Sequence, residues 1–307
     1  MASQLQDEAR RLGERVEGDP EHAATAVPRL AEILALGAQD EAVLVEAVDA
    51  LGKAYDTAAA QALLADVPAD HPSAAVRLAL VRALPGGVVT PGPLRDRVVA
   101  ELVRLTRDEE PRVRDWAAFG LRQVDADEQT ARDALAARLD DPDAGARGEA
   151  LVALAATGDR RAVDALLGRL DGEEDLRLPE LEAAALLADP ALHEPLERLA
   201  AEWAGDDDEF TEPLRLARAR CRPDSAEQAA LAEARALRAV RATVPTGFTA
   251  QLHGSYPRSV VRVAHDRLGT IDFALWAEGE DPWDHPTTDV IDAVTRTFGA
   301  QVPDRRR

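Results

Sequence analysis

Residues 108–170 contain the same sequence pattern twice, and this repetition limits what the chain can fold into. The copies begin at Asp108 and Asp141, 33 residues apart, and in each an arginine follows six residues later, at Arg114 and Arg147, within an apolar helical pattern. A fixed period of this length is typical of a solenoid of helix pairs, in which each unit buries its apolar face only against its neighbours. The repeat therefore predicts stacked helix pairs.

The apolar face of the first helix in each pair extends the repeat in both directions. Its residues stand at positions i, i+4, i+7 and i+8, which lie on one side of a helix. Five copies share this register: Val43, Ala47, Ala50 and Leu51; Val76, Leu80, Ala83 and Leu84; Val113, Ala117, Gly120 and Leu121; Ala146, Ala150, Ala153 and Leu154; and Pro179, Ala183, Leu186 and Leu187. One step is longer by 4 residues, which the Gly- and Pro-rich residues 86–93 accommodate because no helix crosses such a segment. A helix over residues 3–17, with Leu5 among its apolar residues, is expected to cap the array.

These copies resemble the HEAT-like repeats of the short, phycobilisome-lyase type, in which Asp and Arg stand in the same relation ahead of an A-x-x-A-L helix. The resemblance covers residues 20–205 and implies a mostly α protein, a right-handed α-solenoid of helix pairs whose members are here called A and B. It weakens at Leu44 and Glu180, which stand where the arginine is expected. The signature motifs of ankyrin and tetratricopeptide repeats are absent from the sequence.

The repeated acidic and basic residues predict a structural ladder. Asp108 and Asp141 are expected to cap helix N-termini, where a carboxylate satisfies free N–H groups. Arg77, Arg114 and Arg147, one turn into their helices, are expected to reach the aspartate of a neighbouring unit. An anion-binding site is the alternative interpretation of the same residues.

The predicted B helices, at residues 57–67, 93–107, 128–139, 159–170 and 190–204, carry the candidate binding residues. In solenoids of this kind the B helices line the concave surface that partners use. The arginines on them are Arg97, Arg104, Arg132, Arg138, Arg161, Arg169 and Arg198. A groove lined by arginines would select an acidic peptide or protein segment by bidentate pairing. The alternative is that these arginines pair with carboxylates of their own helices.

After the repeats, two helices are expected at residues 210–221 and 224–243. The last fifth of the chain then differs in composition from the repeats, and its pattern predicts strands at 249–255, 258–265 and 270–277 and a helix at 286–299. Six of the eleven aromatic residues lie after residue 244. We therefore expect two parts, a solenoid at 1–244 and a small C-terminal α+β unit at 245–307, with about three antiparallel strands and one helix, docked on the solenoid end. A recognition module on a flexible linker is the alternative.

Charge and composition exclude several classes of function. A net charge of −21 and a pI of 4.7 disfavour nucleic acid and anionic membranes, which require a basic surface. With Cys221 as the single cysteine, no disulfide framework can form within the chain. The first residues do not have the pattern of a secretory signal, and no apolar run approaches the ~20 residues of a membrane span. A soluble, cytoplasmic protein is expected.

Residues for catalysis or metal binding form no recognisable motif. His253, His265 and His285 match no metal-ligand spacing, and the single His193-Glu194 pair contrasts with the repeated pairs of HEAT-type di-iron hydroxylases. A phosphate-binding loop and a G-x-S-x-G motif are both absent from the sequence. The sequence therefore predicts a scaffold for protein–protein interaction that is not an enzyme and has no cofactor or metal. An enzyme, or a lyase- or chaperone-type HEAT protein that holds a small ligand or a cofactor-bearing protein, is the alternative.

Overall fold

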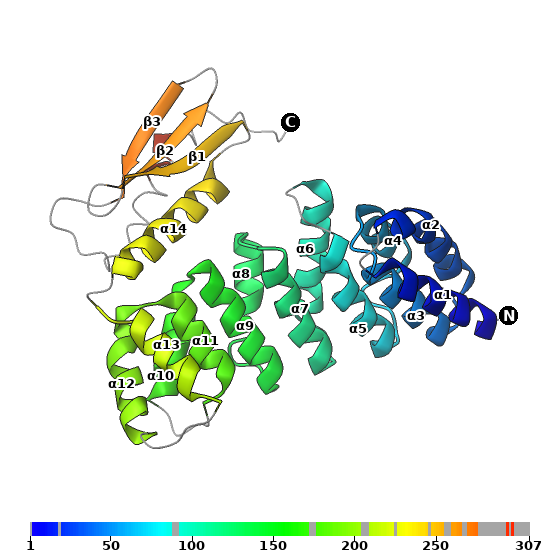
Figure 1. Cartoon of the computed structure of the whole chain (residues 1–307), viewed down its shortest axis with the longest axis horizontal. Helices are drawn as coiled ribbons and strands as arrows, with labels where there is room; N and C mark the ends of the chain where they lie inside the picture. The colour runs from blue at the N-terminus through cyan, green and yellow to red at the C-terminus, as the bar shows by residue number, and fades with distance from the viewer. Residues whose placement is uncertain are drawn as a thin grey trace. The chain divides into compact units, whose positions relative to one another are not determined.

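The computed structural model describes most of the chain as helices, with a three-stranded sheet near the C-terminus (Figure 1). The described residues are 2–17, 20–87, 92–171, 176–203, 209–223, 226–244, 247–254, 259–265, 269–275, 293–294 and 296–297. The chain divides into two compact units, Met1–Ala153 and Leu154–Arg307, with the division inside helix α9.

The first unit consists of helices stacked in two layers. Its elements are α1 (Ala2–Val16), α2 (Pro20–Leu36), α3 (Glu41–Gly52), α4 (Thr57–Asp66), α5 (Ala74–Ala83), the 3-10 turn η1 (Leu84–Gly87), α6 (Pro93–Leu105), α7 (Pro111–Gln123), α8 (Gln129–Ala136) and the first part of α9 (Ala144–Thr157). Helices α1, α3, α5 and α7 pack side by side in one layer, which we call the A layer. Helices α2, α4, α6 and α8 pack side by side in the other, the B layer.

Local sequence signals explain where these helices begin. The side chains of Asp40 and Ser73 accept hydrogen bonds from backbone N–H groups in the first turns of α3 and α5. Helices α6 and α7 begin with Pro93 and Pro111, whose missing N–H costs nothing at the first helical position.

The repeated apolar face is the core of the stack. Of its twenty predicted positions, eighteen are buried, and Pro179 and Leu186 are partly buried. The small residues of this face let neighbouring helices approach closely. The close approach also involves Gly52, which follows this face at the end of α3: a Cβ there would lie 2.9 Å from the Cα of Ala83 in α5. The predicted register is therefore confirmed.

Helix α1 packs as a member of the A layer. Its buried residues are Ala9, Gly13 and Val16, whereas Leu5 is only partly buried. A Cβ at Gly13 would lie 3.2 Å from the Cα of Ala50, so glycine permits the close contact between α1 and α3. The N-terminal helix thus repeats the small-residue packing of the later A helices.

The predicted ladder joins successive repeats. Arg77 donates to both carboxylate oxygens of Asp108 at 2.7 and 2.8 Å, and Arg114 does the same to Asp141 at 2.8 and 2.7 Å. The remaining Nη1 of each arginine donates to backbone carbonyls five and six residues earlier in the chain. Arg147 repeats this local contact with the carbonyl of Asp141 at 2.6 Å. The equivalent position in the next repeat, residue 174, lies outside the described residues.

The prediction that Asp108 and Asp141 cap helices was wrong. Each aspartate accepts a hydrogen bond from the N–H two residues later, that of Glu110 or Asp143, in the turn before the helix. Asp143 is the residue that caps α9, by accepting from the N–H of Ala146 at 3.0 Å. The aspartates of the ladder therefore do not cap a helix. Each one binds the backbone of the turn and the arginine of the preceding repeat.

The ladder lacks both its arginine and its aspartate between α3 and α5, and the loss of the first accounts for the loss of the second. Leu44 replaces the arginine in α3, so the next repeat has no guanidinium to bind. The residue at the aspartate position of that repeat is His71, whose Nδ1 accepts the N–H of Ser73 at 3.1 Å. The histidine keeps the turn hydrogen bond, and no carboxylate is buried without its partner.

The second unit continues the helix pairs and adds the sheet. Its further elements are α10 (Arg160–Leu170), α11 (Leu178–Leu187), the 3-10 turn η2 (Pro190–Leu192), α12 (His193–Glu202), α13 (Thr211–Arg220), α14 (Ala226–Thr243), β1 (Phe248–His253), β2 (Val260–His265) and β3 (Gly269–Ala274). Helix α13 packs on α11, and α12 packs on α10, in the manner of the earlier repeats. Among the described residues, no helix is sufficiently long and apolar to span a membrane.

The three strands form an antiparallel sheet in the order β1-β2-β3, as predicted. One face of the sheet, including Ala250, Val261 and Val263, shares a core with Ala236 and Val240 of α14. Two polar contacts reinforce this packing: Ser259 donates to the buried Glu233, and Arg241 donates to the carbonyl of Ala250 at 3.0 Å.

The division of the chain at residues 244 and 245 stays a prediction, although α14 and the sheet have a common core. The predicted helix at 286–299 lies largely outside the described residues. Val294, which is described, is helical and buried in the same core.

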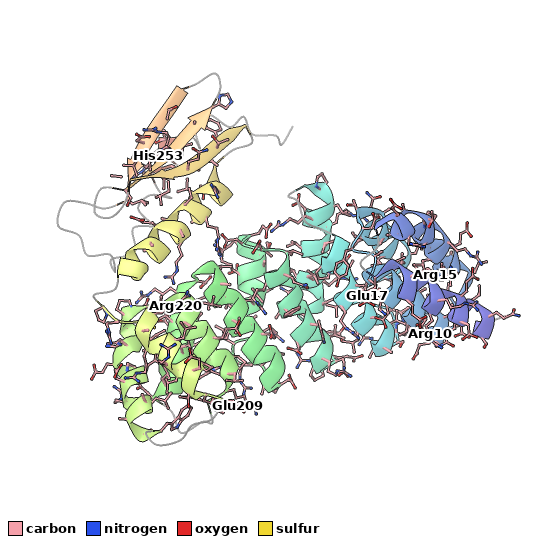
Figure 2. The ribbon with its side chains drawn as sticks, in the orientation of Figure 1. Arg10, Arg15, Glu17, Glu209, Arg220 and His253 are labelled. Carbon is pink, nitrogen blue, oxygen red and sulfur yellow. The ribbon has the colours of Figure 1, made fainter. Side chains whose placement is uncertain are left out.

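Arginines of α13 and α14 bind the C-terminal ends of two A helices in this unit. Arg235 donates to the carbonyl of Leu186 at 3.0 Å, and Arg238 donates to the carbonyl of Ala156. Arg220, at the end of α13 (Figure 2), donates to the carbonyl of Ala185 at 3.3 Å. Guanidinium groups are favourable there because the last carbonyls of a helix have no intrahelical partner and carry partial negative charge.

Candidate binding surface on the B helices

Six of the seven candidate arginines bind carboxylates of this chain. The pairs, with their N–O distances, are Arg104–Glu101 (3.0 Å), Arg132–Asp127 (2.9 Å), Arg138–Asp141 (3.2 Å), Arg161–Asp159 (2.6 Å), Arg169–Glu180 (2.8 Å) and Arg198–Asp171 (2.5 Å). The sequence favoured these arginines equally, whereas the structure separates them into six paired residues and Arg97.

Two of the paired arginines belong to the framework. Arg138 adds a fourth hydrogen bond to the Asp141 carboxylate, which is fully buried and already binds Arg114 and the N–H of Asp143. Arg169 binds Glu180, which is also buried and accepts the N–H of Arg177 at the start of α11. A partner that recruited Arg169 would leave the buried Glu180 without its cation, at a cost of several kcal/mol. A partner that recruited Arg138 would remove one of the hydrogen bonds to the buried Asp141, which keeps Arg114.

Arg97 is exposed on α6, and no carboxylate of the described residues lies within ion-pair distance of it. The nearest candidate in sequence is Glu101, one turn later, but that carboxylate accepts from Nε of Arg104 at 3.0 Å. A guanidinium in this position keeps its donors available for a planar, bidentate acceptor such as a carboxylate.

The surface around Arg97 extends over all four helices of the B layer. We define the B face as the outward positions that recur on these helices at steps of 33 to 36 residues: Thr25, Pro28 and Glu32 on α2; Ala58, Gln61 and Ala65 on α4; Leu94, Arg97 and Glu101 on α6; and Thr130, Asp133 and Ala137 at α8. All twelve are exposed except Leu94 and Glu101, which are partly buried. Glu32 and Asp133, like Glu101, have partners within their own helices.

The B face is therefore a surface of short, mostly uncharged side chains with one uncompensated charge. Small residues let a partner backbone approach the helices closely, and they leave the charge of Arg97 unopposed. The shape and the charge of the B face are therefore suited to a segment of a partner protein that is largely neutral and carries a carboxylate.

In the part of the chain that the structure describes, residues with possible catalytic roles form no metal site and no activated nucleophile. Within the described ranges, no group of three His, Cys, Asp or Glu side chains could hold a metal ion. Burial raises the pKa of the Cys221 thiol to about 12, and the Asp189 carboxylate adds to the shift, so the thiol is neutral and a poor nucleophile. His253 lies at the end of β1 (Figure 2), and His265 packs against Phe248. His285 lies outside the described residues.

Comparison with known proteins identifies the repeats. Residues 99–188 match the family model of HEAT repeats. This match covers helices α7 to α11 completely, and α7, α9 and α11 are three of the helices that gave the resemblance. This part of the chain therefore consists of HEAT-like repeats.

The chain is also similar to solved structures, and one of them has a TM-score above 0.5. The X-ray structure of YibA of E. coli has a TM-score of 0.52 and 21% sequence identity, over 72% of this chain and 85% of that chain. An engineered protein has a TM-score of 0.40 and 19% identity, over 69% of this chain and 96% of its own. Human deoxyhypusine hydroxylase in complex with glycerol has a TM-score of 0.35 and 25% identity, over 72% and 80% of the two chains. No curated protein matches the chain.

Proposed function

We propose that the chain is a protein-binding scaffold, not an enzyme, and that its B face binds a segment of a partner protein through Arg97. HEAT-like solenoids are suited to this role because stacked helices present one extended surface to a partner. The observation that supports the proposal best is the contrast between Arg97 and the six other arginines, which already bind carboxylates.

The charge of the whole chain restricts the partner further. A net charge of −21 repels a strongly acidic segment over roughly one Debye length, about 8 Å at physiological salt. A segment with one or two carboxylates avoids most of this repulsion and still forms the bidentate pair with Arg97. We therefore expect a mainly uncharged partner segment in which an aspartate or glutamate is the anchoring residue.

A pair of charge reversals tests the proposal. Arg97→Glu should reduce capture of partner proteins from native lysate at least tenfold, because it replaces the pairing cation with a repelling anion; tenfold corresponds to about 1.4 kcal/mol. Arg107→Glu is the matched control, since it makes the same charge change at an exposed arginine ten residues away, outside the B face, and leaves the pair of Arg104 and Glu101 intact. Capture quantified by mass spectrometry should change less than twofold for the control.

The circular dichroism of both variants should match that of the unmodified chain. If Arg97→Glu captures the same proteins in the same amounts as the unmodified chain, Arg97 is not the anchor and the B face loses its main support.

A further inference from the structure

A second surface lies on the A layer of the first unit, centred on the aromatic residues of α7. Trp116 and Phe119 are partly exposed, with ring centroids 5.3 Å apart and planes at 76°. The guanidinium of Arg82, on α5, lies 5.3 Å from the Trp116 centroid, and that of Arg122 lies 5.0 Å from the Phe119 centroid. These rings are a rigid, partly apolar platform of the type that forms the centre of many protein interfaces.

Two carboxylates near this platform have cations in their vicinity, Arg82 and Lys53 for Asp49 and Arg112 for Asp115, but no bidentate partner. Asp49 on α3 and Asp115 on α7 are both partly buried, and the described residues give neither side chain an ion pair or a hydrogen bond. Burial raises the pKa of Asp49, with Glu46 adding to the shift and Arg82 opposing it. Burial also raises the pKa of Asp115, and the nearby Asp143 carboxylate adds to that shift.

These carboxylates contrast with those of the ladder. Asp108 and Asp141 have a bidentate arginine each, whereas Asp49 and Asp115 have lost part of their hydration without gaining a partner. A cation supplied from outside would therefore gain more here than at a fully solvated aspartate.

We propose that Asp49, Arg82, Asp115, Trp116 and Phe119 form a second interaction surface, which binds a basic segment of a protein partner. Lysine or arginine side chains of that segment pair with Asp49 and Asp115, and their aliphatic stems pack on the exposed parts of the two rings. The guanidinium groups of Arg82 and Arg122 repel such a segment only weakly, because each already lies near a carboxylate. Arg82 lies over Trp116 and within the field of Asp49, and Arg122 lies 3.6 Å from Glu149.

The net charge of the chain supports the same partner. At −21, the chain attracts basic segments at long range and speeds their association, while the aromatic platform supplies short-range contacts. The scaffold would thus have two faces with different preferences: a neutral segment with a carboxylate for the B face, and a basic segment for this surface.

Neutralising the two carboxylates tests the inference without removing the rings. The probe is a fluorescein-labelled peptide of three Leu-Arg-Ala-Lys units, measured by fluorescence anisotropy in 0.15 M salt (roughly physiological ionic strength). Asp49→Asn combined with Asp115→Asn should weaken binding at least tenfold. Asp66→Asn combined with Asp96→Asn is the matched control, because it removes the same charge from exposed positions of α4 and α6, and it should weaken binding less than twofold.

Three results would overturn the inference. Equal weakening by both double variants would mean that only the diffuse charge of the chain attracts the peptide. Unchanged binding by the Asp49/Asp115 variant would place the peptide elsewhere. Equally tight binding of a peptide with glutamine in place of arginine and lysine would mean that the rings, and not the carboxylates, determine the partner.

Discussion

Replacement of Arg114 by alanine should lower the free energy of unfolding by about 3–5 kcal/mol, the usual cost of removing one partner of a buried ion pair. The side chains of Arg114 and Asp141 are 9% and 0% exposed, and the substitution removes the bidentate pair from this buried carboxylate, to which only Arg138 and the N–H of Asp143 then donate. The substitution also removes the hydrogen bonds from Nη1 to the carbonyls of Asp108 and Glu109, which hold the turn before α7. Urea denaturation followed by circular dichroism measures the loss.

Arg104→Ala is the matched control for this experiment. Arg104 is 48% exposed and pairs with Glu101 on its own helix, and such surface pairs contribute about 1 kcal/mol or less. A double variant, Arg114→Met with Asp141→Leu, should recover a large part of the stability because no buried charge is left without a partner. Equal losses for Arg114→Ala and Arg104→Ala would contradict the structural role of the ladder.

The ladder also predicts how stability depends on pH. Burial alone would raise the pKa of Asp141, but hydrogen bonds from Arg114 and from the N–H of Asp143 outweigh it and hold the pKa below its ordinary value of 3.8. A carboxylate with a lowered pKa in the folded state stabilises that state above its unfolded pKa, and the contribution is lost as the pH falls through the folded value. The difference in stability between the unmodified chain and Arg114→Ala should therefore shrink below about pH 4.

The second large effect concerns the apolar face of the A helices. Leu121→Ala or Leu154→Ala should each destabilise the chain by about 2–5 kcal/mol, because each leaves a cavity in a fully buried contact between helices. Leu5→Ala, at a partly buried position of α1, should cost less because less surface is returned to water. Urea midpoints give the ranking, and equal shifts for the three variants would contradict it.

Helical periodicity made the core predictable from the sequence. A residue such as Leu121 recurs in every repeat at the same helical angle, and burial follows that angle because each A helix packs on the next in the same way. The pairing of Arg114 with Asp141 was predictable for the same reason, since the stacking of equivalent helices brings the start of one repeat against the next.

Helical periodicity could not predict which aspartate caps α9 or which arginine of the B helices has no ion pair among the described residues, because both depend on the conformation of individual side chains. An aspartate near a helix start satisfies backbone N–H groups either as the N-cap or in the preceding turn, and Asp141 does the second while Asp143 does the first. Likewise, Glu101 lies within helical reach of both Arg97 and Arg104. Only the side-chain geometry shows that it binds Arg104.

Site-specific photo-crosslinking tests the central claim, that a partner lies across the B layer, most directly. A photoreactive amino acid would replace Gln61 on α4 or Thr130 on α8, two exposed positions on either side of Arg97, and, as the control, the exposed Gln4 of α1 in the A layer. The proposed function predicts that the same partner is crosslinked from positions 61 and 130, that Arg97→Glu abolishes both products, and that position 4 gives neither. A partner crosslinked equally well from position 4, or crosslinks at positions 61 and 130 that persist in the Arg97→Glu variant, would contradict it.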